Sequence, residues 1–174
     1  MEISKVERKI LAQQYKILAL LEPSERGAYE NRQEILESGY ELHYSTLFQD
    51  IYDPFPESET VFVHDVLSMY SSFKDSIEKH KIQDEKLLQQ LRFTGFDGNN
   101  ETAHVGYLQF FIGKMDRFNE LKTDGPRRDD FNSHMQMRPI YARQLKKYNE
   151  LKQQQGRVLP EDSLRKVVAY PDRQ

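Results

Sequence analysis

A glutamate and a histidine, Glu101 and His104, are separated by two residues in a segment that we expect to be helical. Residues three apart on a helix lie on the same face, so both side chains could reach one metal ion. Helical bundles that hold metals in this way need a second pair of the same kind and two further glutamates. Among the five histidines, only His104 has a glutamate three residues before it. We therefore predict no metal site.

The segment that begins at Asp97 has the start of a calcium-binding loop, but it does not have the rest of one. Such a loop needs glycine at its sixth position and glutamate at its twelfth. Here these positions hold Thr102 and Leu108. Elsewhere, His64 and Asp65 are adjacent on an expected helix, where neighbouring side chains do not face each other. The chain contains no Gly-x-Ser-x-Gly motif and no phosphate-binding glycine loop, so we predict no catalytic residues and no cofactor.

Two polar stretches, residues 96–107 and 131–134, combine glycine, aromatic and hydrogen-bonding residues in or beside expected loops. Loops carry binding residues disproportionately often. Asn99 or Asn100 is expected to cap the helix that starts near Glu101, and its free N–H groups would favour an anionic small molecule. The long stretch 122–138 could fold over this site. The candidate ligand-binding residues are Phe96, Asp97, Asn99, Asn100, Glu101, His104, Tyr107, Asn132 and His134. The alternative is that both stretches only cap helices and fill a subunit interface.

The elements that must position these residues are helices, because apolar residues recur at helical spacing along most of the chain. We expect an all-α fold, a single-domain orthogonal bundle of about seven to eight helices around a long central helix. That central helix is Glu57 to His80. The other expected helices are Ile3 to Leu21, Ser24 to Ser38, Ser45 to Tyr52, Asp84 to Leu91, Glu101 to Leu121, Pro139 to Gln155 and Pro160 to Val168. Capping signals support several of these bounds, including Ser4 with Glu7, and Gly39.

The length of 174 residues fits one domain, which we place at residues 1–170 with a frayed tail at 171–174. The absence of cysteine excludes disulfides and fits a reducing compartment. The first 21 residues carry too many charges for a signal peptide, and no apolar run is long enough to cross a membrane. We therefore expect a cytoplasmic protein that does not contact membranes.

The charge is unevenly distributed along the chain. Residues 1–137 carry a net charge of −8, and residues 138–174 carry +5. Acidic residues interrupt the basic end, so we expect it to be a solvated face or to dock on an acidic neighbour, rather than to bind nucleic acid. Apolar arcs on several helices are wider than one domain can cover. Together with the opposite charges of the two parts, this predicts a homo-oligomer.

Several short segments resemble the YfbU family of small bacterial proteins, and their order and spacing match from Met1 to about Val168. They are Gln14-Tyr15-Lys16, Ser38-Gly39-Tyr40, Met69-Tyr70, Phe93-Thr94-Gly95-Phe96-Asp97-Gly98, Gly106-Tyr107 and Phe131-Asn132-Ser133-His134. The resemblance implies an all-α domain that self-associates. Some members join this domain to a DNA-binding module, which implies a sensing or regulatory role. It provides no catalytic residue to transfer to this chain.

The functional hypothesis from sequence is a non-enzymatic interaction or ligand-sensing module that acts as a homo-oligomer. The alternative is a small-molecule or nucleotide-processing enzyme with its site at residues 96–107 and 131–134. A third hypothesis is RNA binding by the basic C-terminal third of the chain.

Overall fold

The computed structural model describes residues 2–122 and 131–169, and its internal contacts divide the chain into two compact units, Met1–Pro54 and Phe55–Gln174. The expected frayed tail at 171–174 lies outside the described residues. Eight α-helices and no β-strand occur in the described ranges, which confirms the all-α prediction.

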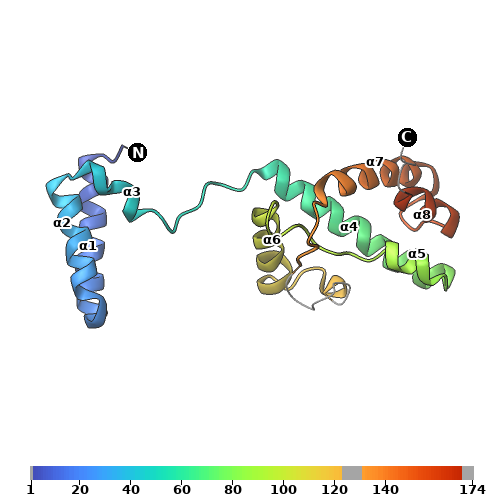
Figure 1. Cartoon of the computed structure of the whole chain (residues 1–174), viewed down its shortest axis with the longest axis horizontal. Coiled ribbons are helices and arrows are strands. Elements are labelled where there is room, and N and C mark those ends of the chain that lie inside the picture. The colour runs from blue at the N-terminus through green and yellow to red at the C-terminus, as the bar shows by residue number, and fades with distance from the viewer. Residues whose placement is uncertain (1, 123–130, 170–174) are drawn as a thin grey trace. The chain divides into compact units, whose positions relative to one another are not determined.

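The first unit is a helical hairpin (Figure 1). Helix α1 (Lys5–Leu21) and helix α2 (Arg26–Ser38) pack side by side, joined by a 3-10 turn at Pro23–Glu25. As predicted, the Ser4 hydroxyl accepts the N–H of Glu7, whose carboxylate in turn accepts the N–H of Ser4. Gly39 ends α2 with φ of 71°. Few side chains are buried within this unit, and all but one are small or aliphatic: Ala12, Ala19, Leu36 and Tyr44.

Helix α3 (Tyr44–Leu47) is shorter than the predicted helix, which extended to Tyr52. A 3-10 turn at Glu41–His43 precedes it. Short helices are stable mainly when an apolar face packs against something. Ile51 and Tyr52 are 73% and 89% exposed, so they provide no such packing, and the chain leaves the helix after Leu47.

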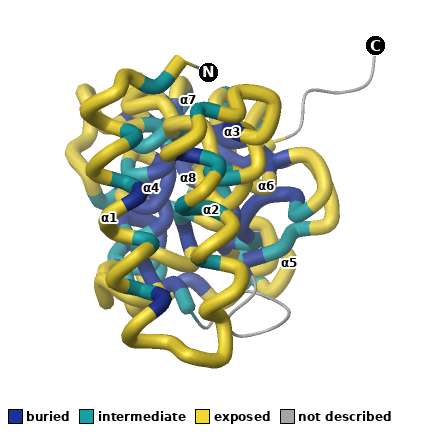
Figure 2. The backbone as a smooth tube through the Cα atoms, turned by 90° about the vertical axis from the view of Figure 1, so that its left-hand side faces the viewer, coloured by how far each residue is buried: buried dark blue, intermediate teal, exposed yellow. Residues whose placement is uncertain are grey.

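The second unit is built on α4 (Glu57–His80), which has the predicted bounds. Helices α6 (Thr102–Leu108), α7 (Arg138–Gln155) and α8 (Glu161–Val168) pack against it, and α5 (Glu85–Gln90) follows it in the chain. Most buried residues, dark blue in Figure 2, belong to this unit, whereas the residues of α1 and α2 are mostly exposed. An aromatic cluster occupies the core: Tyr70 contacts Phe73, Phe93 and Tyr141 with ring centroids 5.0–5.5 Å apart.

The predicted helix from Glu101 to Leu121 is broken into three parts. After α6 the chain forms a π-helix at Gln109–Lys114 and then a 3-10 turn at Asn119–Leu121. Asp116 and Phe118 between them have positive φ, which no helix allows. Two glycines in this stretch, Gly106 and Gly113, weaken a continuous α-helix.

Two segments of the second unit, residues 93–101 and 131–137, are irregular, and their backbones hydrogen-bond to each other. Phe96 N–H donates to the carbonyl of Phe131, and Ser133 N–H donates to the carbonyl of Phe96, both at 2.9 Å. Gly95 has φ of 83°, and a Cβ there would lie 1.9 Å from the Phe131 oxygen. The pairing therefore requires glycine at this position.

We predict that Gly95→Ala destabilises the protein by roughly 3 kcal/mol, because alanine is strained at positive φ and its methyl group displaces Phe131. Gly106→Ala is the matched control. It lies in α6 with no atom within 4 Å of the added Cβ, and should stabilise the protein by up to about 1 kcal/mol. Urea denaturation followed by circular dichroism measures both. Equal stability of the two variants would contradict the role assigned to Gly95.

Candidate functional site

The carboxylate of Glu101 joins the two irregular segments of the second unit. Its side chain is buried and accepts three backbone N–H groups. Oε2 accepts from Asp97 at 2.8 Å and from Met137 at 3.0 Å, and Oε1 accepts from Arg138 at 2.7 Å. Met137 and Arg138 begin α7, so a negative charge here also faces the positive end of that helix.

The prediction that Asn99 or Asn100 caps α6 is wrong. The N-cap residue is Glu101, and no side chain caps the helix. The Asp97 carboxylate is the acceptor in this turn: it takes the Asn99 N–H at 2.9 Å and the Asn100 side-chain amide at 2.5 Å. The hydrogen bond from Asn100 is the main reason why the pKa of Asp97 is lowered.

Asn132 and His134 reach the same turn from the second segment, as the sequence suggested. The Asn132 side-chain oxygen accepts the N–H groups of Gly98 and His134, both at 3.0 Å. A Cβ on Gly98 would lie 2.7 Å from the Asn132 amide nitrogen, so the contact is close. His134 itself is exposed and has φ of 56°. Its charge lowers the pKa of Asp97 slightly.

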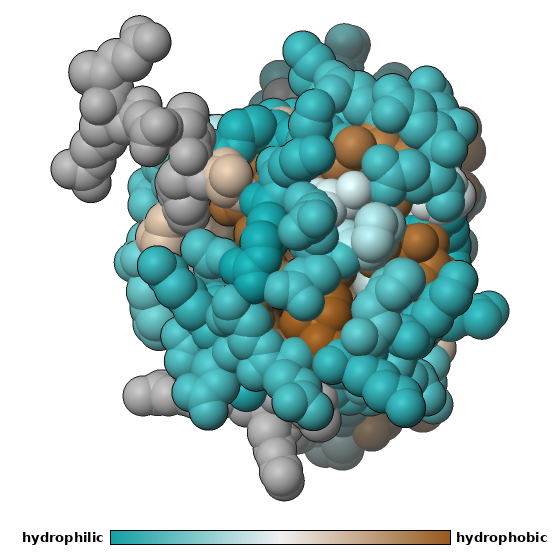
Figure 3. All heavy atoms as spheres, turned by 90° about the vertical axis from the view of Figure 1, so that its right-hand side faces the viewer, coloured by the Kyte–Doolittle hydropathy of each residue, from teal (hydrophilic) through white to brown (hydrophobic). Residues whose placement is uncertain are grey.

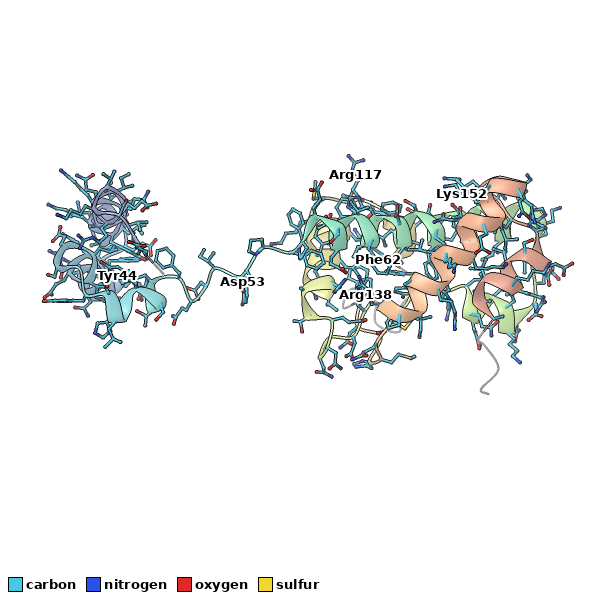
Figure 4. All side chains as sticks on the ribbon, turned by 90° about the horizontal axis from the view of Figure 1, so that it is seen from above. Tyr44, Asp53, Phe62, Arg117, Arg138 and Lys152 are labelled. Atoms are coloured by element: carbon cyan, nitrogen blue, oxygen red, sulfur yellow. The ribbon has the colours of Figure 1, made fainter. Side chains whose placement is uncertain are left out.

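His104 lies one turn into α6 and bonds to a residue that the sequence analysis did not select. Its Nε2 is 2.9 Å from the Glu59 carboxylate on α4. The same carboxylate accepts two hydrogen bonds from the Arg138 guanidinium, at 2.9 and 2.6 Å. Arg138 also lies over the ring of Phe62, 5.0 Å from its centroid (Figure 4). The guanidinium is the main reason why the pKa of Glu59 falls to about 2.

Tyr107 is one turn further along α6 and forms a second histidine contact. Its hydroxyl is 2.7 Å from His64 Nε2, and burial raises its pKa. The His64 ring also stacks on Phe111, with centroids 4.3 Å apart. Phe55 contacts both His104 and Tyr107, which places one aromatic ring across the two histidine pairs.

Phe96 belongs to the core rather than to a surface site. It is fully buried and its ring contacts Phe62, His104 and Tyr141. The structure thus brings the candidate residues together, but most of their hydrogen-bonding groups are directed at each other. This arrangement holds two loops and α7 in place. Ligand binding by these residues stays a prediction.

Metal ligation is not favoured by this geometry, because the Glu101 oxygens face backbone N–H groups and His104 faces Glu59. Within the described ranges, no group of three or more histidine, aspartate or glutamate side chains is arranged to hold a metal ion.

A basic groove in the first unit was missed by the sequence analysis. It has a volume of about 440 Å³ and runs between α1 and α2. Four cationic side chains line it, with Glu37 as the acidic one: Lys5, Arg8, Lys9 and Lys16. The sequence contains a pattern that indicates this groove, because Lys5, Lys9 and Lys16 recur at a spacing that puts them on one face of a helix.

Comparison with known proteins identifies the family. The model of the YfbU domain matches residues 1–169. This chain belongs to the YfbU family. It is 36% identical over 154 residues to the UPF0304 protein MJECS11 of Methanocaldococcus jannaschii, covering 85% of this chain and 90% of the relative. It is 29% identical over 126 residues to the UPF0304 protein MS2240 of Mannheimia succiniciproducens, covering 72% and 76% of the two chains.

The family assignment confirms the resemblance drawn from the short segments, and it covers both units of the structure. The names of the two relatives state no substrate, reaction or partner. In the described part of this YfbU domain, no helix is long and apolar enough to cross a bilayer.

We predict that Glu101→Gln destabilises the protein by roughly 2–4 kcal/mol. The amide places an N–H₂ group against backbone N–H donors, and at least one buried donor loses its charged acceptor. Glu120→Gln, an exposed substitution in the same unit, should change stability by less than about 0.5 kcal/mol. Thermal and urea unfolding measure both. A Glu101→Gln protein as stable as the control would show that the carboxylate does not hold the segments together.

We predict that the Glu59 ion pair contributes stability only above acidic pH. Its pKa is lowered to about 2 in the folded chain, against an ordinary value of 4.5, so folding favours the ionised form. The contribution, about 3 kcal/mol, is present above pH 4.5 and is lost as the pH falls toward 2. Glu59→Gln should remove this part of the acid sensitivity. Unfolding measured from pH 6 to pH 2 tests it, and parallel pH profiles for wild type and variant would contradict it.

Proposed function

We propose that this protein is a non-enzymatic interaction module that acts as a homo-oligomer, and that α1 forms the contact between copies. The observation that carries the proposal is an apolar stripe along α1. Five aliphatic side chains on this helix are at least half exposed: Val6, Ile10, Ile17, Leu20 and Leu21. Helical spacing places them on one face of α1.

The thin core of the hairpin supports this proposal. Among the described residues of the first unit, four are buried, and two of these are alanines. A unit of this size buries a small share of its apolar surface and is marginally stable by itself. Covering the stripe with apolar surface would stabilise the hairpin at about 25 cal/mol for each Å² buried.

Charge complementarity favours a second copy of the hairpin as the occupant. Lys5, Lys9 and Lys16 lie along one edge of α1. On α2, Glu30 and Glu34 are exposed one turn apart, whereas Glu37 lines the same groove as the lysines. A two-fold axis pairs the same patch on both copies, so the lysine edge of one hairpin can face the glutamate edge of the other. From sequence, residues 138–174 were expected to form the basic surface of the interface. The hairpin of the first unit carries a basic and an acidic surface of its own.

The arrangement of the candidate residues 96–107 and 131–134 supports a non-enzymatic role. Glu101, Asp97 and His104 each face groups of the protein itself, at 2.5–3.0 Å. A general acid or base must lie within hydrogen-bond reach of a substrate proton. Here those positions are taken by backbone N–H groups, an asparagine amide and Glu59.

The proposal predicts that the whole chain sediments as a dimer or larger species, and that Ile10→Glu with Ile17→Glu shifts it toward monomer. Burying two carboxylates in an apolar contact is strongly unfavourable. Val61→Glu is the matched control, because Val61 is 53% exposed on α4 in the other unit and should leave the sedimentation unchanged. Analytical ultracentrifugation over a dilution series measures all three.

High salt should also weaken the association, because it screens the lysine and glutamate edges. A monomeric wild type would overturn the proposal. So would a double variant that loses stability but keeps the wild-type oligomer, since the stripe would then be covered within one chain. If Val61→Glu alone dissociates the oligomer, the interface lies in the second unit and not on α1.

A further inference from the structure

The exposed residues of α1 follow a seven-residue repeat, whose positions are labelled a to g. Ile10 and Ile17 are one repeat apart and take position a. The d positions then hold Val6, Gln13 and Leu20. All five side chains are exposed, although four of them are aliphatic. Aliphatic residues that alternate in this way between a and d form the seam along which two helices pair as a coiled coil.

The burial of the other residues of α1 agrees with the same repeat. Between Val6 and Leu21, the e and g positions that flank the seam are all exposed: Glu7, Lys9, Gln14, Lys16 and Leu21. Positions b, c and f lie on the side that packs against α2; there Ala12 and Ala19 are buried and the others are half-buried. The hairpin therefore has a complete, uncovered seam on one side of α1 and α2 on the other.

The second unit differs from α1 in how its apolar residues are covered. Figure 3 shows this unit from the end at which α5 and α8 lie, where hydrophilic side chains separate the apolar ones. On α4, the apolar residues Val63, Val66 and Leu67 are buried in the core. On α1 the aliphatic residues of the seam are uncovered and lie in one line, as they do in a helix whose partner is another chain.

The residue types along the seam favour two parallel strands. β-Branched residues at a with leucine at d are typical of parallel two-stranded coiled coils, and α1 has Ile10 and Ile17 at a and Leu20 at d. The seam is short, about 21 Å from Val6 to Leu20 at 1.5 Å per residue. Because α2 already packs against α1 within each copy, the seam has to supply only the contact between copies.

The charges beside the seam distinguish parallel from antiparallel pairing. In a parallel pair, position g of one helix lies beside position e of the other, so Lys9 lies beside the neutral Gln14 of the second copy. In an antiparallel pair, position g lies beside position g, which brings Lys9 of each copy against Lys16 of the other. Such like-charge contacts are unfavourable, so the lysines favour the parallel direction.

Gln13 is the one polar residue of the seam and lies at its centre. In a parallel pair in register, it meets Gln13 of the second copy, and each side-chain amide can donate to and accept from the other. An antiparallel pair that matches Val6 with Ile17 instead places Gln13 against Ile10, where its amide is buried without a partner. A single polar residue in a seam specifies register in this way, at a cost in stability.

We propose that α1 forms a parallel coiled coil with α1 of a second copy, in register, with the two Gln13 side chains hydrogen-bonded to each other at its centre. This arrangement rests on the self-association proposed for α1, and it adds the direction, the register and the residue that specifies them. Both amino termini lie at the same end of the pair.

Disulfide formation between copies tests the direction and the register, because the chain contains no cysteine of its own. Val6→Cys and Ile17→Cys are made separately in the full-length protein, oxidised mildly and run on non-reducing gels. In the proposed arrangement each cysteine faces the same residue of the second copy, so each variant alone forms a linked dimer. Lys5→Cys is the matched control: it is exposed on α1 at position c, outside the seam, and should stay unlinked.

A mixture of Val6→Cys and Ile17→Cys proteins separates the two directions. The two positions are about 16 Å apart along a helix, and a disulfide joins Cα atoms no more than about 7 Å apart. The parallel pair therefore gives same-residue disulfides only, as mass spectrometry can verify. If only the mixed disulfide forms, or if Lys5→Cys links as readily, the coiled coil proposed here is wrong, although self-association through α1 stands. A monomeric protein in which neither variant links would overturn both proposals.

Gln13→Leu tests the residue that specifies the register. It should lower the dissociation constant of the dimer by up to about tenfold, because no amide is then buried in the seam. At high salt, which screens the lysines, it should also allow antiparallel pairing, so that the mixed disulfide between Val6→Cys and Ile17→Cys chains appears. Gln14→Leu, at a flanking position, should give same-residue disulfides only. The same result for Gln13→Leu would overturn the role assigned to Gln13.

Discussion

The buried carboxylate of Glu101 is the interaction on which the second unit depends. Residues 93–101 and 131–137 form neither helix nor strand, so their backbone groups need partners from outside regular structure. One glutamate supplies an acceptor to both segments and to the first N–H of α7. Because α7 starts at that point, Arg138 projects from a fixed position toward Glu59 on α4. The aromatic core then closes around Tyr141, one turn further along α7.

The helices could be predicted from sequence where the apolar periodicity and the residues that start or end a helix agree. The bounds of α4 follow from a long apolar periodicity between Pro56 and a C-terminal turn, and Gly39 and Gly156 mark helix ends that the structure reproduces. The prediction failed at α3 and at residues 109–121, where local propensity allowed a helix but packing did not continue it. Short apolar patterns do not reveal whether anything lies opposite them.

The candidate site was only half predictable. Composition located the two polar segments, and Asn132 does meet Gly98. The partner of His104 could not be found, because Glu59 and Arg138 lie 45 and 34 residues away from it in the sequence and only the fold brings them together. The role of Glu101 was assigned to Asn99 or Asn100, since asparagine is the usual cap; a carboxylate that reaches across to a second segment leaves no local signature.

The π-helix at Gln109–Lys114 has a consequence for the length of the chain. Its turns hold about one residue more than those of an α-helix, and each residue within it advances the chain by roughly a quarter of a turn around the axis. Ile112, inside this π-helix, is fully buried in the core. Loss or gain of one residue between Leu108 and Ile112 would rotate it out of place. In this stretch the number of residues is therefore constrained more strictly than the identity of the exposed ones, such as Gln109 and Lys114.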